Sequence, residues 1–559
     1  MSRYVVTAHS QEDKLSLLQE FESNLLDATA YSKRNAVYDF TRDQANQLKT
    51  DPRVSAVELH YQDNPNLKYE TQASESANFN RSSVLNDKTY RNWGLIRSTN
   101  RDNSWINSDP YLDLNTNYNW TLDGTGVDVI IVDSGVQAGH PEFAANADGT
   151  GPTRLIDIDW HALWSSYYGH VDNPVPTGAS IGGYLGDSDG HGTNVASITA
   201  GNTNGWARNS LIYSLRCIPT GNAFQTQPDG TPLGTIDVNL FPALVKAFHL
   251  SKPVDPATGY RRPTIVNNSW AFSNTLSPFY GTILDHVNYR GTDYYPPAND
   301  DYPGQNFAII FPEVGVVNSN IPARYPGLDA DIADAVASGV VITAAANNWA
   351  YKIDVPGGAD YNNYAVDNLG DQYYYNQGST PGASPGVICV GALDSTLQYN
   401  TKAETKATFS SAGPRVNIFA PGSGQAGGYR NARFPVPQYG SQVDPRSSLT
   451  PGQTFYLYKL SGTSQATPQV TGVCAMVAQQ NPGWTSDQIL AYLQATATPN
   501  VMQELGALYY PTPGPYLNFP YYANGSLLLG APNLLLFAPA AVPTKTLISG
   551  GNFVGGSVQ

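Results

Sequence analysis

The sequence predicts an α/β protein with a mostly parallel central sheet, preceded by a small α+β unit. Short, mostly apolar runs recur along the chain, at 127–133 ("VDVIIVD"), 263–269 ("PTIVNNS"), 339–346 ("GVVITAAA") and 385–392 ("PGVICVGA"). Continuous apolar runs of this length are typical of parallel strands buried on both faces, and helical segments lie between some of them. We therefore expect one large α/β domain over residues 92–540.

The α+β unit is expected over residues 1–61, where strand patterns alternate with helix-capping patterns. Ser10 and Thr41 each begin a capping-box pattern. Residues 54–61 ("VSAVELHY") alternate apolar and polar side chains, as a half-buried strand does. The expected elements are strands at 4–10, 36–40 and 54–61 and helices after Ser10 and Thr41.

Polar or loop-rich segments connect and interrupt these two units. Residues 62–91 are polar and are expected to form a linker open to proteolysis. Residues 274–325 are rich in Tyr, Pro, Asn and Asp, and residues 423–456 are rich in Gly, Pro and Gln. Both are expected to be long surface insertions in the α/β domain. Residues 541–559 remain as a C-terminal tail.

The charge and hydropathy of the chain exclude two classes of partner. The 559 residues carry a net charge of −15, whereas binding to nucleic acid needs clustered Lys and Arg. No apolar run approaches the roughly 18 residues that a membrane-spanning helix needs. The first residues, "MSRYVVTAHSQEDK", lack the apolar core of a signal peptide. We therefore expect no nucleic-acid or membrane partner, and a cytoplasmic or particle-associated location without Sec export.

The cysteines do not indicate a metal site or a disulfide framework. Cys217, Cys389 and Cys474 lie in apolar contexts and form no CxxC pair. We interpret them as small buried hydrophobic residues.

Two segments place an acid and a histidine where a sheet-edge site would use them. Asp133 ends the apolar run at 127–133, where ligands bind in open parallel sheets. His191 lies between glycines at the start of a helical pattern, where the helix dipole favours the neutral imidazole that a general base needs. Taken alone, Asp133 could equally cap a turn and His191 could simply pack.

A third segment, "LSGTSQATPQVTG" (460–472), places Ser464 at the start of a helix of small side chains. Backbone N–H groups at a helix N-terminus can stabilise an oxyanion. Pro468 is expected within the first turn of that helix, because proline lacks the N–H that later turns require. Asp133, His191 and Ser464 together favour nucleophilic catalysis over a separate structural role for each.

The chain resembles the subtilisin-like (S8, subtilase) serine endopeptidases. The segments 133–143 ("DSGVQAGHPEF"), 190–201 ("GHGTNVASITAG") and 461–472 ("SGTSQATPQVTG") resemble the aspartate, histidine and serine motifs of that family, in the family's order. The resemblance implies a three-layer subtilisin-like fold. Further similar segments lie at 92–97, 266–272, 340–348, 385–395, 409–422 and 530–537.

The resemblance also implies a role for each site residue. Ser464 would be the nucleophile, His191 the general base, and Asp133 the group that orients the imidazole. Asn347 would stabilise the oxyanion with its side-chain amide. The substrate cleft would be lined by Ser269, Trp270, Ala271, Phe272, Ala344, Ala345 and Ala346.

The resemblance extends to an N-terminal propeptide. It leaves open whether the chain binds a structural calcium ion. Residues 1–61 resemble the inhibitor-I9-like propeptide of the family, so polypeptide substrates and the chain's own prodomain are the expected partners. No cofactor is required for the chemistry, and no metal ligand is assigned. The segment 201–209 ("GNTNGWARN") is too short for the calcium-binding loop of secreted subtilisins, although Glu142 could be a ligand elsewhere.

Several residues depart from the family pattern. Asn194, Gln465 and Gln469 stand where many relatives carry His, Met and His, and Ala346 replaces a glycine. Ala271 and Phe272 also replace glycines, so their side chains could narrow or block the cleft.

Two function classes follow from the sequence. The first is an active serine endopeptidase that works through an acyl-enzyme intermediate and is controlled by its prodomain. The second is a weakly active or inactive structural or binding protein on a subtilase scaffold, for example a virion component. A lipase is excluded by the lack of a GxSxG motif.

Overall fold

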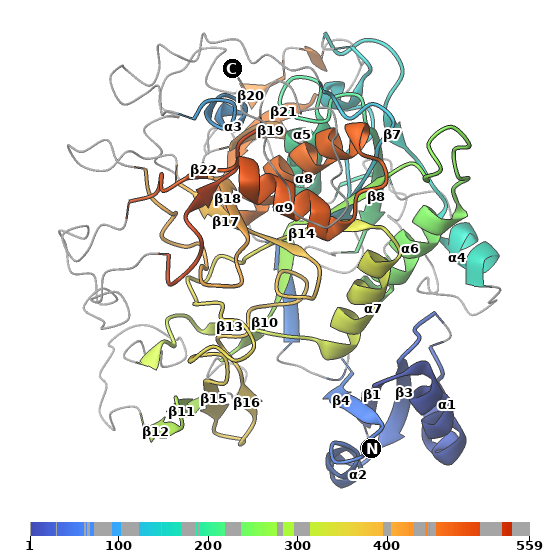
Figure 1. The fold of residues 1–559 in the computed structure, drawn as a ribbon, viewed down its shortest axis with the longest axis vertical. Coiled ribbons are helices and arrows are strands. Elements are labelled where there is room, and N and C mark those ends of the chain that lie inside the picture. Colours follow the sequence, from blue (N-terminus) through green and yellow to red (C-terminus); the bar gives the residue numbers. More distant parts are fainter. Residues whose placement is uncertain are drawn as a thin grey trace.

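A computed structural model of the protein shows a large α/β body with a smaller α+β unit beside helix α7 (Pro326–Ala337) (Figure 1). The structure describes residues 2–29, 31–60, 63, 67–71, 92–101, 122–146, 148–168, 185–187, 189–217, 236–276, 283–295, 314–394, 404–423, 425–429, 442–444, 446–447, 454–503 and 528–538. The expected C-terminal tail at 541–559 lies outside these residues.

The central sheet has nine described strands in the order β22-β23-β18-β17-β14-β9-β6-β8-β7. All neighbouring pairs are parallel except β22 with β23. The prediction of an α/β fold with a mostly parallel sheet is therefore confirmed. The strands are β6 (Asp128–Asp133), β7 (Leu155–Ile156), β8 (Leu211–Arg216), β9 (Thr264–Asn268), β14 (Val341–Ala345), β17 (Ile388–Leu393), β18 (Ile418–Pro421), β22 (Thr498–Pro499) and β23 (Leu534–Leu535).

Helices cover both faces of this sheet, which makes the α/β body three layers thick (Figure 1). Val129 and Ile131 of β6 point into the core beneath one helical layer, whereas Ile130 and Val132 point into the core beneath the other. All six residues of β6 are buried, because both faces of the strand are covered. One layer contains α5 (His191–Ala200), α8 (Thr463–Gln480) and α9 (Ser486–Thr496), and the other contains α4 (Trp160–Tyr168), α6 (Phe241–Ser251) and α7.

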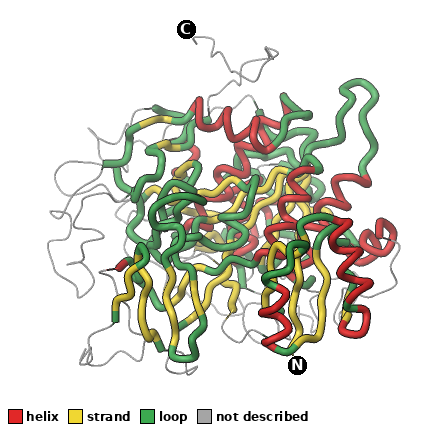
Figure 2. The backbone as a smooth tube through the Cα atoms, turned by 60° about the horizontal axis from the view of Figure 1, so that its bottom comes forward, coloured by secondary structure: helices red, strands yellow, loops and turns green. Residues whose placement is uncertain are grey.

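The N-terminal unit is an antiparallel sheet in the order β2-β3-β1-β4, with helices beside it (Figure 2). Ser10 caps α1 by accepting a hydrogen bond from the N–H of Asp13, and Thr41 forms a complete capping box with Gln44. Both predicted caps are therefore present. The elements are β1 (Ser2–Ala8), α1 (Gln11–Glu20), β2 (Leu25–Asp27), β3 (Asn35–Phe40), α2 (Arg42–Leu48) and β4 (Val54–Leu59).

The segment expected to be a plain linker contains a strand, β5 (Leu67–Thr71). β5 pairs antiparallel with β10 (Trp270–Thr275), and β10 pairs on its other side with β13 (Asn320–Pro322). The pattern of residues 62–91 alone did not indicate this strand, because its backbone hydrogen bonds are made to a strand about 200 residues later in the chain.

The two predicted insertions also contribute strands in their described parts. The first supplies β11 (Leu284–Tyr289) and β12 (Thr292–Tyr294), which form a small sheet with β15 (Tyr364–Asp367) and β16 (Gln372–Tyr373). The second supplies β19 (Gln425–Tyr429) and β20 (Gln442–Val443), which flank β21 (Tyr456–Leu460), and β19 packs against α5. This second insertion therefore covers the helix that carries His191.

Two simpler expectations can be compared directly with the structure. All three cysteines are buried and free of disulfide bonds, as predicted. Among the described residues, no helix has both the length and the apolar character needed to cross a bilayer.

Candidate active site

Asp133 and His191 meet at the carboxyl edge of the central sheet. Asp133 is the last residue of β6, and His191 is the first residue of α5. The imidazole Nδ1 lies 2.8 Å from the carboxylate Oδ1, and both side chains are buried. The backbone N–H of Ser134 also donates to Oδ1 at 2.7 Å, so the carboxylate is held in place by its own turn.

The glycines around His191 are required by the close packing of two turns. A side chain on Gly192 would place its Cβ 2.0 Å from the carbonyl oxygen of Gly135. Gly190 precedes the helix with φ +104°, in the left-handed region that favours glycine. These glycines therefore let the start of α5 approach the end of β6 closely enough for His191 to reach Asp133.

The pKa of His191 is set by two opposing effects. Burial alone would lower the pKa of the imidazole, because a charged ring loses its hydration. The negative charge of Asp133, the hydrogen bond to it and the charges of Asp189 and Asp187 together outweigh burial, and the pKa is raised above its ordinary value. The pair therefore favours a protonated imidazole, which is the state that a general base reaches after taking a proton.

A second buried carboxylate, Asp187, holds the turns that carry this pair. Its Oδ1 accepts hydrogen bonds from the hydroxyl of Ser134 at 2.9 Å and the N–H of Gly190 at 2.8 Å. Its Oδ2 accepts from the N–H and the hydroxyl of Thr193. Asp187 was not among the predicted site residues, although an Asp three residues before a helix-capping glycine is itself a turn signal.

Ser464 is the second residue of α8 and lies against the end of β9. Its hydroxyl donates to the carbonyl of Ser269 at 2.8 Å, and the hydroxyl of Ser269 donates back to the carbonyl of Ser464 at 2.9 Å. The Nε2 of His191 has no hydrogen-bond partner within the part of the chain that the structure describes. The Ser464 hydroxyl is therefore aligned on Ser269 rather than on His191 in this structure.

The expected position of Pro468 is wrong. Helix α8 begins at Thr463, so Pro468 is its sixth residue and lies inside the helix. A proline there has no N–H to donate to the carbonyl four residues earlier, which is that of Ser464. The Ser269 hydroxyl supplies the missing hydrogen bond, and this is why the helix tolerates the proline.

Asn347 follows β14 with φ +74° and is fully buried. Its Oδ1 accepts from the N–H of Trp349 at 3.2 Å and from the hydroxyl of Ser411. Its Nδ2 lies 3.4 Å from the hydroxyl of Ser379, a long contact. The carbonyl side of the amide is thus firmly held, and the N–H side is left to donate.

These residues can now be compared with known proteins. Residues 124–510 match a family model, Peptidase_S8, described as the Subtilase family. The chain belongs to the subtilase family. Its matches with the Bacillus subtilisins cover 35% to 49% of the length of those proteins.

Two relatives and one solved structure illustrate the similarity. Subtilisin E of Bacillus subtilis (strain 168) is 30% identical over 185 residues, which are 33% of this chain and 35% of that protein. The Extracellular serine proteinase of Thermus sp. (strain Rt41A) is 23% identical over 414 residues, or 74% of this chain and 63% of that protein. The structure of fervidolysin from Fervidobacterium pennivorans, a keratinolytic enzyme related to subtilisin, is 17% identical, with a TM-score of 0.45, and covers 89% of this chain and 57% of that chain.

The expected location, cytoplasmic or particle-associated without Sec export, is wrong. The relative from Thermus sp. is an extracellular serine proteinase, and its similarity extends over most of this chain. The prediction failed because it depended on where the printed sequence begins, which does not decide whether the protein is exported.

The aromatic residues of this subtilase's predicted cleft strand turn into the core. The ring of Phe272 packs 5.5 Å from that of Trp270 and 5.9 Å from that of Tyr325, measured between centroids. Phe272 and Trp270 are two residues apart on one strand and therefore share one face. Both side chains are buried in the core. The backbone edge of β10 is paired with β5. Ala271, Ala344, Ala345 and Ala346 are all buried.

The residues that depart from the family pattern contact one another or their immediate surroundings. Gln465 Nε2 donates to Asn194 Oδ1 at 3.3 Å, and Asn194 Nδ2 donates to the carbonyl of Tyr458 at 3.1 Å. Gln469 Oε1 accepts from the indole N–H of Trp206 at 2.6 Å, and its Nε2 donates to Asn92 Oδ1 at 2.7 Å. These substitutions therefore form polar contacts of their own around α8.

Proposed function

We propose that the protein is a serine endopeptidase that hydrolyses peptide bonds through Asp133, His191 and Ser464. The observation that carries the proposal is the buried 2.8 Å contact between Asp133 and His191 Nδ1, with Nε2 left without a partner among the residues that the structure describes. This contact fixes the tautomer in which Nδ1 carries the proton and Nε2 can accept one.

The proposed reaction begins with a rotation of the Ser464 side chain. A turn about its Cα–Cβ bond moves the hydroxyl from the carbonyl of Ser269 toward Nε2 of His191. Catalytic hydrogen bonds are often formed only once substrate is bound. The oxygen of Ser464 then attacks the substrate carbonyl while His191 takes the proton, and His191 returns that proton to the leaving amine. Water, activated by the same imidazole, hydrolyses the acyl-enzyme.

Asn347 is proposed to stabilise the tetrahedral oxyanion together with the backbone N–H of Ser464. Because Trp349 and Ser411 hold the Oδ1 side of its amide, the Nδ2 side is pre-oriented and needs little rearrangement during the reaction. Its contact with Ser379 is long at 3.4 Å, so exchanging it for a hydrogen bond to the oxyanion costs little.

The N-terminal region is proposed to inhibit the enzyme within the same chain. Strand β5 pairs with β10 from Trp270 to Asn274, directly after Ser269, whose carbonyl holds the Ser464 hydroxyl. An extended peptide substrate would use the same backbone edge, so β5 and the substrate would compete for it. The chain must then be cut after Thr71, within residues 72–91, to clear the cleft.

The α+β unit is suited to anchor this strand on the catalytic domain. Glu58 accepts a hydrogen bond of 2.8 Å from the N–H of Gly327 at the start of α7. Ser32 donates to Asp331 of the same helix at 2.6 Å, and Asn35 donates to the carbonyl of Gly327 at 2.8 Å. These contacts hold the unit beside α7, as seen at the lower right of Figure 1.

N-terminal sequencing of protein incubated after purification tests this proposal. Wild type is expected to lose its leader by a cut within residues 72–91 and then to hydrolyse a denatured protein substrate. Ser464→Ala is expected to remain full length and folded. Wild-type protein that stays full length and hydrolyses nothing would favour the alternative, an inactive structural or binding protein on a subtilase scaffold.

A further inference from the structure

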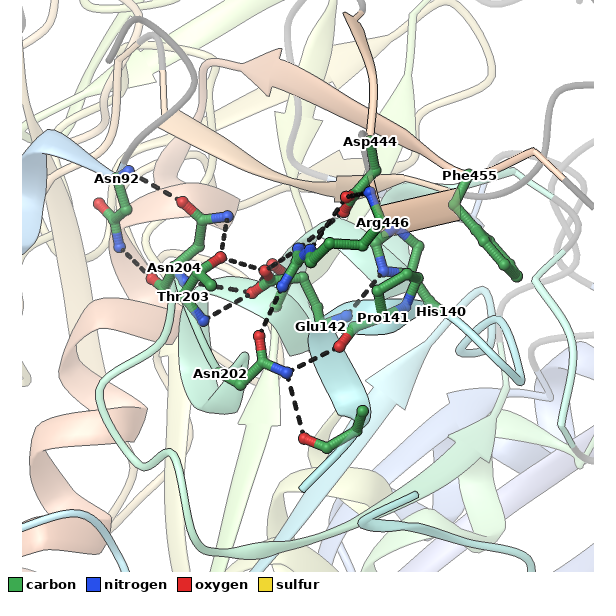
Figure 3. A network of polar contacts seen from close by, with 12 residues as sticks. Asn92, His140, Pro141, Glu142, Asn202, Thr203, Asn204, Asp444, Arg446 and Phe455 are labelled. Carbon is green, nitrogen blue, oxygen red and sulfur yellow. Dashed lines mark hydrogen bonds and ion pairs between the residues drawn. The ribbon is translucent and has the colours of Figure 1, made fainter. Parts of the chain in front are cut away.

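Glu142 is the centre of a buried polar network beside the candidate active site (Figure 3). It lies in the short turn Pro141–Phe143 and is fully buried. Its carboxylate accepts a hydrogen bond of 3.1 Å from the N–H of Asn204 and others from the N–H and hydroxyl of Thr203. A buried carboxylate of this kind requires a positive partner, because hydrogen bonds alone do not neutralise its charge.

The positive partner is Arg446, which lies 304 residues later in the chain. Its Nη2 is 2.5 Å from Glu142 Oε1 and 2.7 Å from Asp444 Oδ2, and its Nη1 is 2.8 Å from Asn202 Oδ1. Oxygens of three residues therefore accept hydrogen bonds from one guanidinium. Glu142 was predicted from the sequence as a possible metal ligand. Its ion pair with Arg446 was not predicted.

The oxygen donors around Arg446 are of the kind that calcium prefers, namely carboxylates and an amide carbonyl. The family resemblance leaves open whether the chain binds a structural calcium ion. The segment 201–209 is too short for the calcium-binding loop of the secreted subtilisins. The contacts add a stronger reason, since the guanidinium already occupies the centre of this oxygen set. The residues present therefore do not fit a calcium ion at Glu142.

We propose that the guanidinium of Arg446 is the cation of this site. It stabilises the fold at the position where a divalent metal ion would otherwise be needed. The guanidinium neutralises Glu142 and ties the insertion at 423–456 to the catalytic domain. Stability at this site is then independent of divalent metal ions.

The network reaches the helix that begins with His191. Ser197 of α5 lies 3.4 Å from Glu142 Oε2, and Asn202, just after α5, donates to the carbonyl of Pro141 at 2.7 Å. His140, two residues before Glu142, contacts the carbonyl of Tyr456 on the insertion sheet at 3.1 Å. The cation therefore stabilises the packing of the insertion against α5.

The charge state of Glu142 agrees with this arrangement. Burial would raise the pKa of the carboxyl, but the charge of Arg446 and hydrogen bonds from Thr203 and Arg446 lower it to about 2. Removal of the guanidinium would leave only the hydrogen bonds from Thr203 and Asn204 to offset the burial penalty.

Thermal unfolding of the full chain tests the proposal, with Ser464→Ala as the background so that self-cleavage does not interfere. The parent Tm is expected to be the same in EDTA and in excess calcium. Arg446→Ala is expected to lower the Tm by roughly 5 °C or more, because it leaves a buried charge unpaired. Methylguanidinium at about 10 mM should restore part of that loss, whereas an equal concentration of NaCl should not.

Two control variants separate the site from general effects. Arg446→Ala combined with Glu142→Gln and Asp444→Asn removes all three charges of the site, so it should be more stable than Arg446→Ala alone and should not respond to methylguanidinium. Arg290→Ala also removes a guanidinium from a buried carboxylate, Asp360, but that carboxylate keeps Lys352 at 2.6 Å. Its Tm should fall less and should not respond to methylguanidinium.

Three results would overturn the proposal. One is a parent Tm that falls in EDTA while Glu142→Gln removes that sensitivity, which would place a metal ion at Glu142. Another is a Tm of the Arg446→Ala variant that lies within about 1 °C of the parent Tm. If Arg446→Ala cannot be obtained folded, Arg446→Lys replaces it, with an intermediate Tm unchanged by EDTA as the supporting result. A Tm of Arg446→Lys that rises with calcium is the third contradicting result.

Discussion

Ser464 and Ser269 exchange hydrogen bonds, each hydroxyl donating to the other's backbone carbonyl at 2.8 and 2.9 Å. The exchange links the start of α8 to the end of β9, and it supplies the hydrogen bond that Pro468 cannot make. It also means that the hydroxyl of the proposed nucleophile is held in a defined position by the carbonyl of Ser269.

Removal of the nucleophile should abolish hydrolysis without unfolding the chain. Ser464→Ala deletes one oxygen from a fully buried position and should lower turnover by about 10⁴-fold or more, since triad members act as a unit. Turnover of a fluorogenic peptide and the Tm are the two measurements. Ser251→Ala, at the end of α6 on the opposite layer, is the matched control and should behave as wild type. A Ser464→Ala enzyme with more than about a tenth of the wild-type rate would exclude Ser464 as the nucleophile.

Asn347→Ala should lower kcat with little change in KM. The Nδ2 amide is proposed to meet a charge that exists only in the transition state, so ground-state binding does not depend on it. The expected loss is about 10²–10³-fold, the size known from an oxyanion asparagine in a subtilisin. Steady-state kinetics on one peptide series separates kcat from KM. Equal kcat in the two enzymes would remove Asn347 from the oxyanion site.

The acid limb of the pH profile should report His191. The general base must be neutral, and Asp133 raises the pKa of the imidazole above its ordinary 6.5 despite burial. Activity should therefore be full at high pH and should be lost as pH falls through a midpoint above 6.5. Asp133→Asn should move that midpoint to lower pH and reduce the rate by about 10⁴-fold. A kcat/KM that stays constant from pH 9 to pH 4 is the opposite outcome and would exclude an imidazole base.

The N-terminal unit should dock more tightly at low pH. Burial at the interface raises the pKa of Asp331 to about 6 and that of Glu58 well above its ordinary value. Release returns both carboxyls toward their ordinary pKa values, so the stabilisation is complete below those values. It is lost as pH rises through the raised ones.

The docking prediction can be measured on Ser464→Ala protein nicked within residues 72–91 by an inserted protease site. Size-exclusion chromatography should find the leader bound at pH 5 and released to a greater extent at pH 8. Glu58→Gln and Asp331→Asn should each reduce the difference between the two pH values. A leader that dissociates more readily at pH 5 would reverse the sign and contradict the assignment.

The sequence was sufficient to predict the central sheet, and it also indicated the three residues of the proposed triad, which stay a prediction. The apolar run at 127–133 predicts a doubly covered strand, because burial on both faces leaves only apolar residues between Asp128 and Asp133 of β6. Asp133, His191 and Ser464 were identifiable because their chemistry demands those residue types in short, glycine-rich surroundings. Both kinds of information are local, and local patterns can be read from one sequence.

The remaining features depend on residues that are far apart in the chain. The pairing of β5 with β10 and the contact between Glu142 and Arg446 each join segments separated by about 200 residues or more. A strand edge or a buried carboxylate can be predicted to need a partner, but the sequence does not say which segment supplies it. The prediction that Pro468 lies in the first turn of α8 was wrong for the same reason. The hydroxyl of Ser269, a residue far away in the chain, supplies the hydrogen bond that the proline cannot make.

Labelling with a fluorophosphonate, followed by peptide mapping, tests the central claim most directly. The reagent reacts only with a serine that a neighbouring base activates, so it reports the working arrangement of Ser464 and His191 in one step. We predict a single adduct on Ser464 that is slow to form while the leader is attached, fast once the leader is removed, and absent from Asp133→Asn and His191→Ala. Protein freed of its leader that forms no adduct on Ser464, or forms one equally fast without His191, would contradict the proposed catalytic site.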